Sequence, residues 1–418
     1  MLSNNIELEK KAQQAKQAAT SLAVLPTNIK NEALLKMADA LEFEAEFILT
    51  ENHKDIENGT QKGLRASLLD RLLLTKERIT AMAEGLRQTV SLPDPVGEGL
   101  GATVRPNGLE IRKVRVPLGV IGIIYEARPN VTADAVGLCL KSGNAVILRG
   151  GSEAINSNIA IIKVLTTAAE KAGSTAGAIA FIENTDRQVV NEMLKLNQYL
   201  DVIIPRGGAG LIKTVVENST VPVIETGTGV CHTFIDESAD LNMALAIAIN
   251  AKVSRPAVCN SMETLLIHEA VAKTFMPAVL KSLAEHKVEV RGCEKTCALD
   301  SNIKMASPED WAKEYGDLIL NIKIVTDINE AIAHIGQYST RHSEAIITND
   351  YNNSRKFQNE VDAAAVYVNA STRFTDGFEF GYGAEIGIST QKLHARGPMG
   401  LTELTSTKYV ILGSGQIR

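Results

Sequence analysis

The sequence predicts an α/β protein with two domains, each built on a parallel sheet. Short apolar runs alternate with helical patterns twice, over 113–227 and again over 231–369. Continuously apolar strands separated by helices are typical of a parallel sheet that is covered on both faces. The 418 residues, 45% of them hydrophobic, are enough for two such cores. We therefore expect an open, Rossmann-like sheet followed by a second α/β domain.

The first 90 residues are predicted to be helical. Within 32–48, apolar residues recur every three or four positions and mark one face of a single helix, namely Leu34, Met37, Leu41, Ala45 and Ile48. The stretch SLPDPVGEG at 91–99 then breaks the pattern with two prolines and two glycines.

The first alternation is expected to contain five strands and four helices. The strands are 113–127, 144–150, 178–184, 200–207 and 221–227, and the helices are 130–143, 152–173, 185–196 and 209–219. In the second alternation, the expected strands are 231–236, 262–268, 318–326, 344–350 and 363–371, and the helices are 241–252, 271–287, 328–339 and 351–361.

Three further segments look like strands outside these two sheets: 109–116, 376–390 and 407–413. Outlying ribbons of this kind offer unpaired backbone groups. We expect them to pair with another subunit, which would make the protein a homo-oligomer.

Charge and hydropathy exclude several classes of function. A net charge of −6 and a pI near 5.8 argue against nucleic-acid binding. No apolar run reaches the roughly 18 residues of a membrane span. The first residues lack the apolar core of a secretory signal, so we expect a cytoplasmic protein.

Five cysteines are scattered along the chain, at 139, 231, 259, 293 and 297. Their odd number favours free thiols over disulfides. Cys293 and Cys297 lie near His286, but no second pair of ligands follows, so we expect no metal site.

Two glycine turns are candidate phosphate sites. In ILRGGSEA, Arg149 ends a strand, Gly150 and Gly151 follow, and Ser152 opens a helix. Bare N–H groups at a helix N-terminus suit a phosphate, and the arginine suits an adenosine ribose or its phosphate. The alternative is an ordinary turn with a solvated arginine. RGGAG at 206–210 is a weaker example of the same pattern.

Glu225 and Cys259 are the candidate catalytic residues. Glu225 ends an apolar strand, where ligands of open α/β sheets bind, although it would equally suit a surface or capping role. Pro256 is predicted to stop the helix before Cys259 and to place this thiol on a turn, next to Arg255 and Asn260. An exposed turn suits a nucleophile, whereas Cys139 and Cys231 are expected in the core.

A glutamate followed 34 residues later by a turn cysteine resembles the aldehyde dehydrogenase superfamily. Longer stretches, over 125–151, 325–346 and 366–401, resemble the γ-glutamyl phosphate reductase family within it. The resemblance covers essentially the whole chain. It implies an aldehyde-dehydrogenase-like fold with an NADP-binding domain at 1–100 and 117–226, a catalytic domain at 227–395, and a β oligomerisation segment at 101–116 and 396–418.

The resemblance also implies a reaction. The family reduces L-glutamyl 5-phosphate to glutamate 5-semialdehyde with NADPH, through a thioester on the cysteine, in the second step of proline synthesis. Cys259 would be the nucleophile. Asn130 would join the Cys259 N–H in an oxyanion hole, with Asn260 as a rival. Glu225 stays without a firm role, because a reductase that releases phosphate must avoid hydrolysing the thioester.

Binding roles follow from the same resemblance. For the cofactor they fall on Arg149, Gly150, Gly151 and Ser152 at the adenosine side, Gly207 and Gly208 at the pyrophosphate, and Glu314 at the nicotinamide ribose. For the substrate they fall on arginines in family-like motifs, which match phosphate and carboxylate oxygens: Arg128, Arg255, Arg373 and also Arg396.

Glutamate 5-kinase is an expected partner, because the acyl phosphate is labile. Two other classes stay open on the residues alone. One is a hydrolytic aldehyde dehydrogenase with Glu225 as its base, and the other is a nucleotide-binding scaffold without activity.

Overall fold

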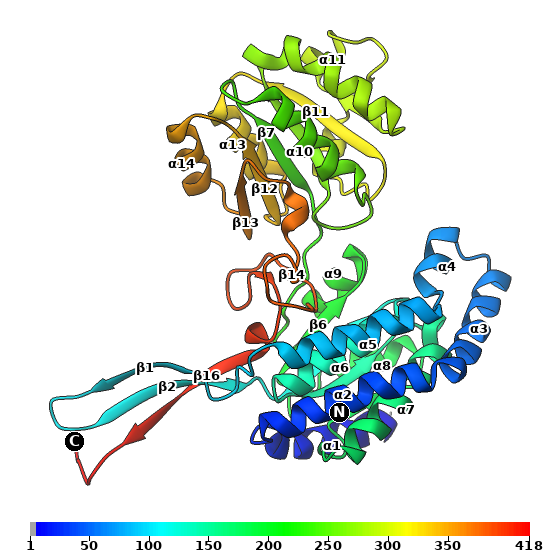
Figure 1. Cartoon of the computed structure of the whole chain (residues 1–418), viewed down its shortest axis with the longest axis vertical. Coiled ribbons are helices and arrows are strands. Elements are labelled where there is room, and N and C mark those ends of the chain that lie inside the picture. Colours follow the sequence, from blue (N-terminus) through cyan, green and yellow to red (C-terminus); the bar gives the residue numbers. More distant parts are fainter. Residues whose placement is uncertain (1–5) are drawn as a thin grey trace. The chain divides into compact units, whose positions relative to one another are not determined.

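The computed structural model describes residues 6–418 (Figure 1), apart from the side chain of Ser67. The chain divides into two compact units. The first contains the described residues up to Thr226 together with 381–387 and 399–418, and the second contains 227–380 and 388–398. The segment 381–387, which we expected within a catalytic domain at 227–395, therefore groups with the first unit.

Five helices open the first unit: α1 (Ile6–Leu22), α2 (Thr27–Phe43), α3 (Ala45–Gln61), α4 (Ala66–Leu72) and α5 (Lys76–Ser91). The prediction of one helix across 32–48 is wrong. Glu44 closes α2 and opens α3, with its N–H bonded to Ala40 O and ψ at 17°. The predicted apolar face is nevertheless buried on both sides of this break, at Leu34 and Leu41 in α2 and at Ile48 in α3.

The sheet of the first unit is parallel, in the order β5-β4-β3-β6. Its strands are β3 (Val120–Tyr125), β4 (Ala145–Arg149), β5 (Ile179–Phe181) and β6 (Val202–Arg206). The helices between and after them are α6 (Pro129–Lys141), α7 (Ile155–Lys171), preceded by the 3₁₀ turn η1 (Ser152–Ala154), α8 (Arg187–Met193) and α9 (Ala209–Asn218). The predicted alternation is confirmed for these elements.

The predicted fifth strand, 221–227, is wrong. It makes one isolated parallel bridge, between Val223 and Ile203 of β6. Pro222 accepts a hydrogen bond from the Ile203 N–H but has no N–H of its own to return. The apolar pattern therefore identified a buried, extended segment without a hydrogen-bonded ladder.

The second unit contains a seven-stranded parallel sheet in the order β10-β9-β11-β8-β7-β12-β13. The strands are β7 (Cys231–Ile235), β8 (Met262–His268), β9 (Glu289–Gly292), β10 (Lys304–Met305), β11 (Ile319–Val325), β12 (Ser343–Ile347) and β13 (Ala365–Val368). The five predicted strands are confirmed, and the two short strands β9 and β10, of which β10 forms the edge, were not predicted.

Helices cover both faces of this sheet (Figure 1). They are α10 (Leu241–Val253), α11 (Glu269–Glu285), α12 (Glu294–Cys297), α13 (Ile328–Tyr338) and α14 (Tyr351–Glu360). One apolar cluster joins α10 and α11 to the sheet around Leu265, and another joins α13 and α14 to it around Phe234. A sheet buried on both faces explains why its strands are continuously apolar.

A third sheet, in the order β1-β2-β16, is antiparallel and belongs to the first unit. Its strands are β1 (Gly99–Val104), β2 (Glu110–Pro117) and β16 (Thr405–Leu412), so the strands predicted at 109–116 and 407–413 are confirmed. The prediction of a strand over 376–390 is wrong except at β14 (Ile388–Ser389), which pairs with β15 (Gly397–Pro398). Gly381 and Gly383 have φ angles of 78° and 75°, which no strand accommodates.

None of the helices in 6–418 is both long enough and apolar enough to cross a bilayer. The remaining regular turns are η2 (Pro308–Ala312), η3 (Thr372–Phe374) and η4 (Thr402–Leu404).

Candidate active site

Cys259 lies on the turn that joins α10 to β8 in the second unit, as the sequence predicted. The helix ends at Val253, Pro256 follows in the turn, and β8 begins at Met262. The side chain of Cys259 is partly buried, whereas Cys139 and Cys231 are completely buried. Of these three thiols, the turn leaves Cys259 as the one with access to a ligand.

The backbone of Gly229 forms one wall of this turn. A Cβ atom at Gly229 would lie 1.4 Å from the carbonyl oxygen of Cys259, so no other residue fits without moving the backbone. The same carbonyl oxygen accepts a hydrogen bond from the thiol of Cys231, at 3.2 Å. Burial raises the pKa of Cys231 well above its ordinary value, which keeps this second sulfur protonated and available as a donor.

Side chains from distant segments hold the extended segment that carries Gly229 into β7. Its N–H donates to the Glu314 carboxylate at 3.0 Å, and the next N–H, of Val230, donates to Thr340 Oγ1 at 3.0 Å. The N–H of His232 donates to Glu344 at 2.8 Å. Thr340 and Glu344 belong to the family-like stretch 325–346, so part of that stretch serves to fix the wall of the cysteine turn.

Asn260 ties the cysteine turn to the segment around η3. Its amide nitrogen donates to the carbonyls of Arg373 and Thr375, at 3.2 and 2.9 Å. These two bonds use both hydrogens of the amide. Asn260 is therefore a brace of the turn in this structure, and the rival assignment as an oxyanion donor is not supported by its geometry.

Arg373 is held beside the same turn. Its guanidinium donates to the Asn260 side chain and, at 3.1 Å, to Ser254 Oγ. Burial lowers the pKa of Arg373, and the neighbouring charge of Arg255 lowers it further. The structure therefore brings two of the predicted substrate-binding arginines together near Cys259. The fourth arginine considered, Arg396, is ion-paired with Asp362 at 2.6 Å.

Asn130 and Arg128 lie at the start of α6 in the first unit. Arg128 is the N-cap residue, and Asn130 is exposed in the first turn. The Asn130 amide donates to Asp134 across one turn of the helix, at 3.4 Å. Burial raises the pKa of Asp134 to about 6, which the hydrogen bond from Asn130 partly opposes. The second amide hydrogen of Asn130 is left for a ligand.

Arg149 is turned inward. Only 8% of its surface is exposed, and its two terminal nitrogens donate to the carbonyls of Gly150 and Thr185, both at 2.7 Å. Burial lowers the pKa of Arg149. In this conformation the guanidinium braces the loop after β4.

Gly150 is required by close packing, because a Cβ there would lie 2.2 Å from the amide nitrogen of the buried Asn158. A Cβ at Gly151 would lie 2.6 Å from the Glu153 carboxylate, the end of a flexible side chain. Ser152 then opens η1, which leads into α7. Backbone with no side chain before a helix fits the phosphate groups of a dinucleotide, as the sequence suggested.

The second glycine turn holds a carboxylate that the sequence analysis missed. Glu126 follows β3, and its carboxylate accepts the N–H of Gly208, the N-cap residue of α9, at 3.0 Å. A Cβ at Gly207 would lie 2.6 Å from the same side chain. The helix terminus therefore binds an anionic group, but in this structure that group is Glu126.

The predicted site residues are thus divided between the two units. The first unit contains Asn130, Arg128, Glu225, Arg149, Gly150, Gly151, Ser152, Gly207 and Gly208, and the second contains Cys259, Arg255, Arg373 and Glu314. Across 6–418, no group of three His, Cys, Asp or Glu side chains is arranged to hold a metal ion.

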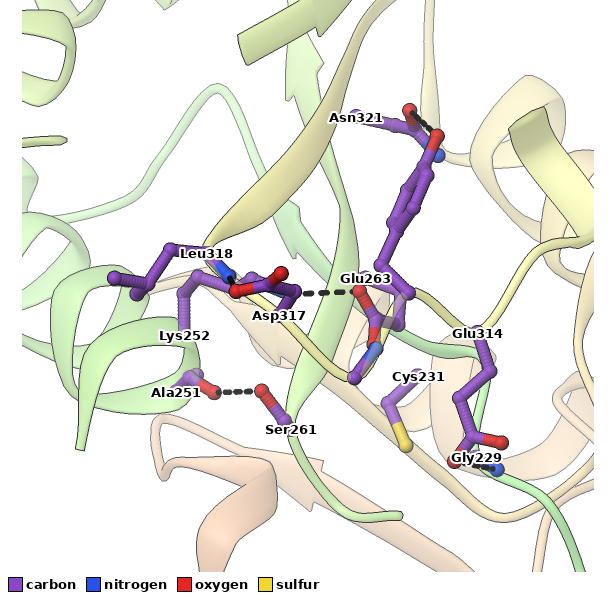
Figure 2. A network of polar contacts seen from close by, with 12 residues as sticks. Gly229, Cys231, Ala251, Lys252, Ser261, Glu263, Glu314, Asp317, Leu318 and Asn321 are labelled. Carbon is purple, nitrogen blue, oxygen red and sulfur yellow. Dashed lines mark hydrogen bonds and ion pairs between the residues drawn. The ribbon is translucent and has the colours of Figure 1, made fainter. Parts of the chain in front are cut away.

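A buried ion pair beside the cysteine turn was also missed (Figure 2). Lys252 Nζ lies 2.7 Å from Glu263 Oε2, and both side chains are completely shielded from solvent. The sequence contains a signal that points to it, since each charged residue interrupts an otherwise apolar helix or strand. Their pairing depends on how α10 and β8 pack, which local patterns do not give.

Comparisons with known proteins identify the family of the chain. Residues 2–305 match the profile of the aldehyde dehydrogenase family. The chain is 62% identical over 413 residues to a γ-glutamyl phosphate reductase from Caldanaerobacter subterraneus, covering 99% of this chain and 100% of that protein. A γ-glutamyl phosphate reductase from Moorella thermoacetica is also 62% identical and covers 99% of both chains.

Solved structures give the same result. The crystal structure of a γ-glutamyl phosphate reductase from Thermotoga maritima superposes with a TM-score of 0.97 at 52% identity, over 99% of this chain and 100% of that one. An acetylating aldehyde dehydrogenase from Geobacillus thermoglucosidasius shares the fold, with a TM-score of 0.71 at 18% identity, over 99% of this chain and 97% of that one. The chain therefore belongs to the γ-glutamyl phosphate reductases of the aldehyde dehydrogenase family.

Proposed function

We propose that the chain reduces L-glutamyl 5-phosphate to L-glutamate 5-semialdehyde with NADPH and releases phosphate, the second step of proline biosynthesis from glutamate. The observation that carries the proposal is Cys259 on its turn, with its carbonyl oxygen packed against Gly229. Full-length identity of 62% to proteins of this name supports the choice of substrate.

Cys259 is the nucleophile. Its thiolate attacks the acyl carbon of the substrate, a C–S bond forms, and the C–O bond to phosphate breaks, so that inorganic phosphate leaves and a glutamyl thioester remains. NADPH, when bound, would supply the hydride that adds to the carbonyl carbon of this thioester. The C–S bond of the resulting hemithioacetal then breaks, which releases the aldehyde and returns Cys259 as the thiolate.

Hydrogen-bond donors stabilise the oxyanion of the tetrahedral intermediate. The proposed donors are the N–H of Cys259 and the amide of Asn130, one hydrogen of which is already bonded to Asp134, so that the other would serve the oxyanion. Losing one donor of this kind typically lowers the rate by about 100- to 1000-fold. Glu225 has no assigned step, because a base that activated water would hydrolyse the thioester and waste the acyl group.

Arginines bind the two anionic ends of the substrate. Arg373 is fixed beside Cys259 by Asn260 and Ser254, and Arg255 extends from the same turn. We assign these two to the groups nearest the reacting carbon, and Arg128, at the start of α6, to an anionic group of the same substrate.

The cofactor is assigned to the two glycine turns. Gly150, Gly151 and Ser152 would receive the adenosine side, and Gly207 and Gly208 the pyrophosphate, while Glu314 would bond the nicotinamide ribose. The glycines before η1 and before α9 leave room for phosphate oxygens. Preference for NADPH over NADH rests on the resemblance to the family, because Arg149 is engaged with carbonyl groups.

Location and partners complete the proposal. We assign the protein to the cytoplasm as a homo-oligomer that assembles through the β1-β2-β16 sheet. Glutamate 5-kinase is the proposed donor of the labile acyl phosphate.

The test is the reverse reaction. NADP⁺ reduction with glutamate 5-semialdehyde is followed with and without phosphate, for the wild type and for Cys259→Ala. The proposal predicts a signal that requires phosphate or arsenate and disappears in the variant. A full-rate signal without phosphate would instead identify a hydrolytic aldehyde dehydrogenase with Glu225 as its base. Cofactor binding without any reaction would point to a scaffold.

A further inference from the structure

Lys252 and Glu263 form an ion pair that lies entirely within the second unit. Their charged atoms are 2.7 Å apart, and the two side chains are 0% and 1% exposed. Burial is the largest influence on both groups: it lowers the pKa of Lys252 and raises that of Glu263 to about 7, against the attraction between the partners. Burying two charges is costly, and an apolar pair of similar volume is often as stable. Stability alone therefore does not account for these two residues.

The two residues stand at opposite ends of the cysteine turn. Lys252 is in the last turn of α10, and Glu263 is the second residue of β8, so the pair closes the base of the loop that carries Cys259. A weaker bond lies alongside, from Ser261 Oγ to the carbonyl of Ala251 at 3.3 Å (Figure 2). The ion pair therefore links the two stems of this loop at a shorter distance than the Ser261 bond does.

The other oxygen of Glu263 reaches a different segment. Oε1 accepts the N–H of Gly316 at 3.1 Å, and Gly316 has a φ angle of 59°, a conformation that glycine readily adopts. Two residues earlier, Glu314 accepts the N–H of Gly229 at 3.0 Å (Figure 2). One carboxylate thus links the cysteine turn to the loop that presents Glu314.

These contacts form a continuous chain that leads back to the nucleophile. Lys252 contacts Glu263, which is bonded to Gly316 in the loop of Glu314. Glu314 is bonded to Gly229, whose backbone lies against the carbonyl oxygen of Cys259. A displacement of the pair would therefore move the Cys259 turn and the Glu314 loop together.

We propose that Lys252 and Glu263 are positioning residues, which hold the Cys259 turn and the Glu314 loop in one fixed arrangement for acyl transfer. The inference rests on the proposed function for the identity of the reaction. The effect on the position and reactivity of Cys259 does not depend on which reaction the chain catalyses. Misplacing a reacting group by about 1 Å can lower a rate by about 100-fold.

The test compares two variants. Glu263→Leu leaves the Lys252 charge buried without a partner, and we expect both a lower melting temperature and a lower kcat. Lys252→Met/Glu263→Leu removes both charges, and we expect it to recover the melting temperature of the wild type but to keep kcat about 10- to 100-fold low. The KM for the semialdehyde should change less than kcat.

A second readout needs no substrate. The rate at which iodoacetamide alkylates Cys259 is measured against pH, with peptide mapping to separate Cys259 from the other thiols. We expect the double variant to shift the apparent thiol pKa or to change the limiting rate at least threefold. If the reductase assignment were wrong, kcat would be absent in every protein while this alkylation difference persisted, so the two failures are distinguishable.

The matched control is the buried pair of Lys30 and Asp94 in the first unit, with charged atoms 2.9 Å apart. Lys30→Met should lower the melting temperature without changing the alkylation of Cys259. The proposal is overturned if the double variant recovers both stability and kcat. It is also overturned if Glu263→Leu loses stability while the alkylation of Cys259 stays at the wild-type rate.

Discussion

At the scale of single residues, the chemistry depends on how little space surrounds the carbonyl of Cys259. Gly229 cannot be replaced by a larger residue without moving the backbone, because a Cβ there would lie 1.4 Å from that oxygen. Cys231 and Asn260 fix the same turn from other directions, through its carbonyl oxygen and through the backbone of 373–375. The Cys259 turn is thus held by the backbone of Gly229, the thiol of Cys231 and the side-chain amide of Asn260.

Gly229→Ala should therefore be damaging. The added methyl group must displace backbone, so we expect a loss of about 2–3 kcal/mol in the free energy of unfolding together with a loss of most activity. Denaturant unfolding and the reverse assay measure the two effects.

Gly336→Ala is the matched control for that variant. Gly336 is exposed in α13, and no atom lies within 4 Å of the position of its added Cβ. We expect a gain of up to about 1 kcal/mol in stability from helix propensity and unchanged activity. Equal behaviour of the two alanine variants would contradict the account of the Gly229 wall.

At the scale of elements, the N-terminus of α9 is the clearest case of competition for one site. The amide of Gly208 is bonded to Glu126, although the cofactor pyrophosphate is assigned to the same place. Glu126→Gln should bind NADPH more tightly, by about two- to fivefold, because a negative charge is removed from the phosphate site.

Fluorescence titration of NADPH measures that affinity. Glu217→Gln serves as the control, since Glu217 lies in the last turn of the same helix and pairs with Lys213. Weaker NADPH binding by Glu126→Gln would show that Glu126 bonds the cofactor directly. That result would contradict the proposal that Glu126 and the pyrophosphate compete for the Gly208 N–H.

The loop that presents Glu314 depends on Asp310. Burial alone would raise the pKa of this carboxyl group, but hydrogen bonds from Ser307, Tyr315 and Arg291 outweigh burial and lower the pKa to about 2. A carboxyl group whose pKa is lower in the folded state than in the unfolded state stabilises the fold at pH values above the unfolded pKa of 3.8. This contribution to stability is lost as the pH falls from about 4 to about 2.

We therefore expect Asp310→Asn to lower the free energy of unfolding by about 2 kcal/mol at pH 7. The difference from the wild type should shrink as the pH falls below about 4. Denaturant unfolding at several pH values provides the measurement. A difference that stayed constant down to pH 2 would contradict the assignment of this contribution to the Asp310 carboxylate.

Sequence patterns predicted most elements because both sheets are buried on two faces and their strands are continuously apolar. The same signal failed at 221–227, where Pro222 interrupts the ladder, and it missed the short strands β9 and β10. Of the site, the cysteine turn followed from Pro256. Contacts of Glu126, and the pairing of Lys252 with Glu263, depend on residues brought together only by folding.

At the scale of the whole molecule, the β1-β2-β16 sheet is the proposed route to assembly. Its outer strands expose large apolar side chains, with Val104, Tyr409 and Ile411 at 70%, 65% and 58% exposure. Tyr409 and Ile411 are two residues apart in β16 and therefore lie on the same face. Apolar groups on an edge strand favour pairing with a second chain.

Replacing Tyr409 and Ile411 with lysine should reduce the mass measured by analytical ultracentrifugation, because the face would become charged. Lys408→Ala, on the opposite face of β16, should leave the mass of the wild type unchanged. A wild type that sediments as a monomer, or a double variant that keeps the assembled mass, would contradict this route.

The central claim is that Cys259 carries the acyl group, and mass spectrometry of the intact protein tests it most directly. Wild type is mixed with glutamate 5-semialdehyde and NADP⁺ without phosphate, quenched in acid and mapped by peptide. The account predicts one glutamyl group on the Cys259 peptide, released on adding phosphate and absent in Cys259→Ala. A wild type that carries no adduct in the absence of phosphate would contradict the account. An adduct that added phosphate does not release would also contradict it.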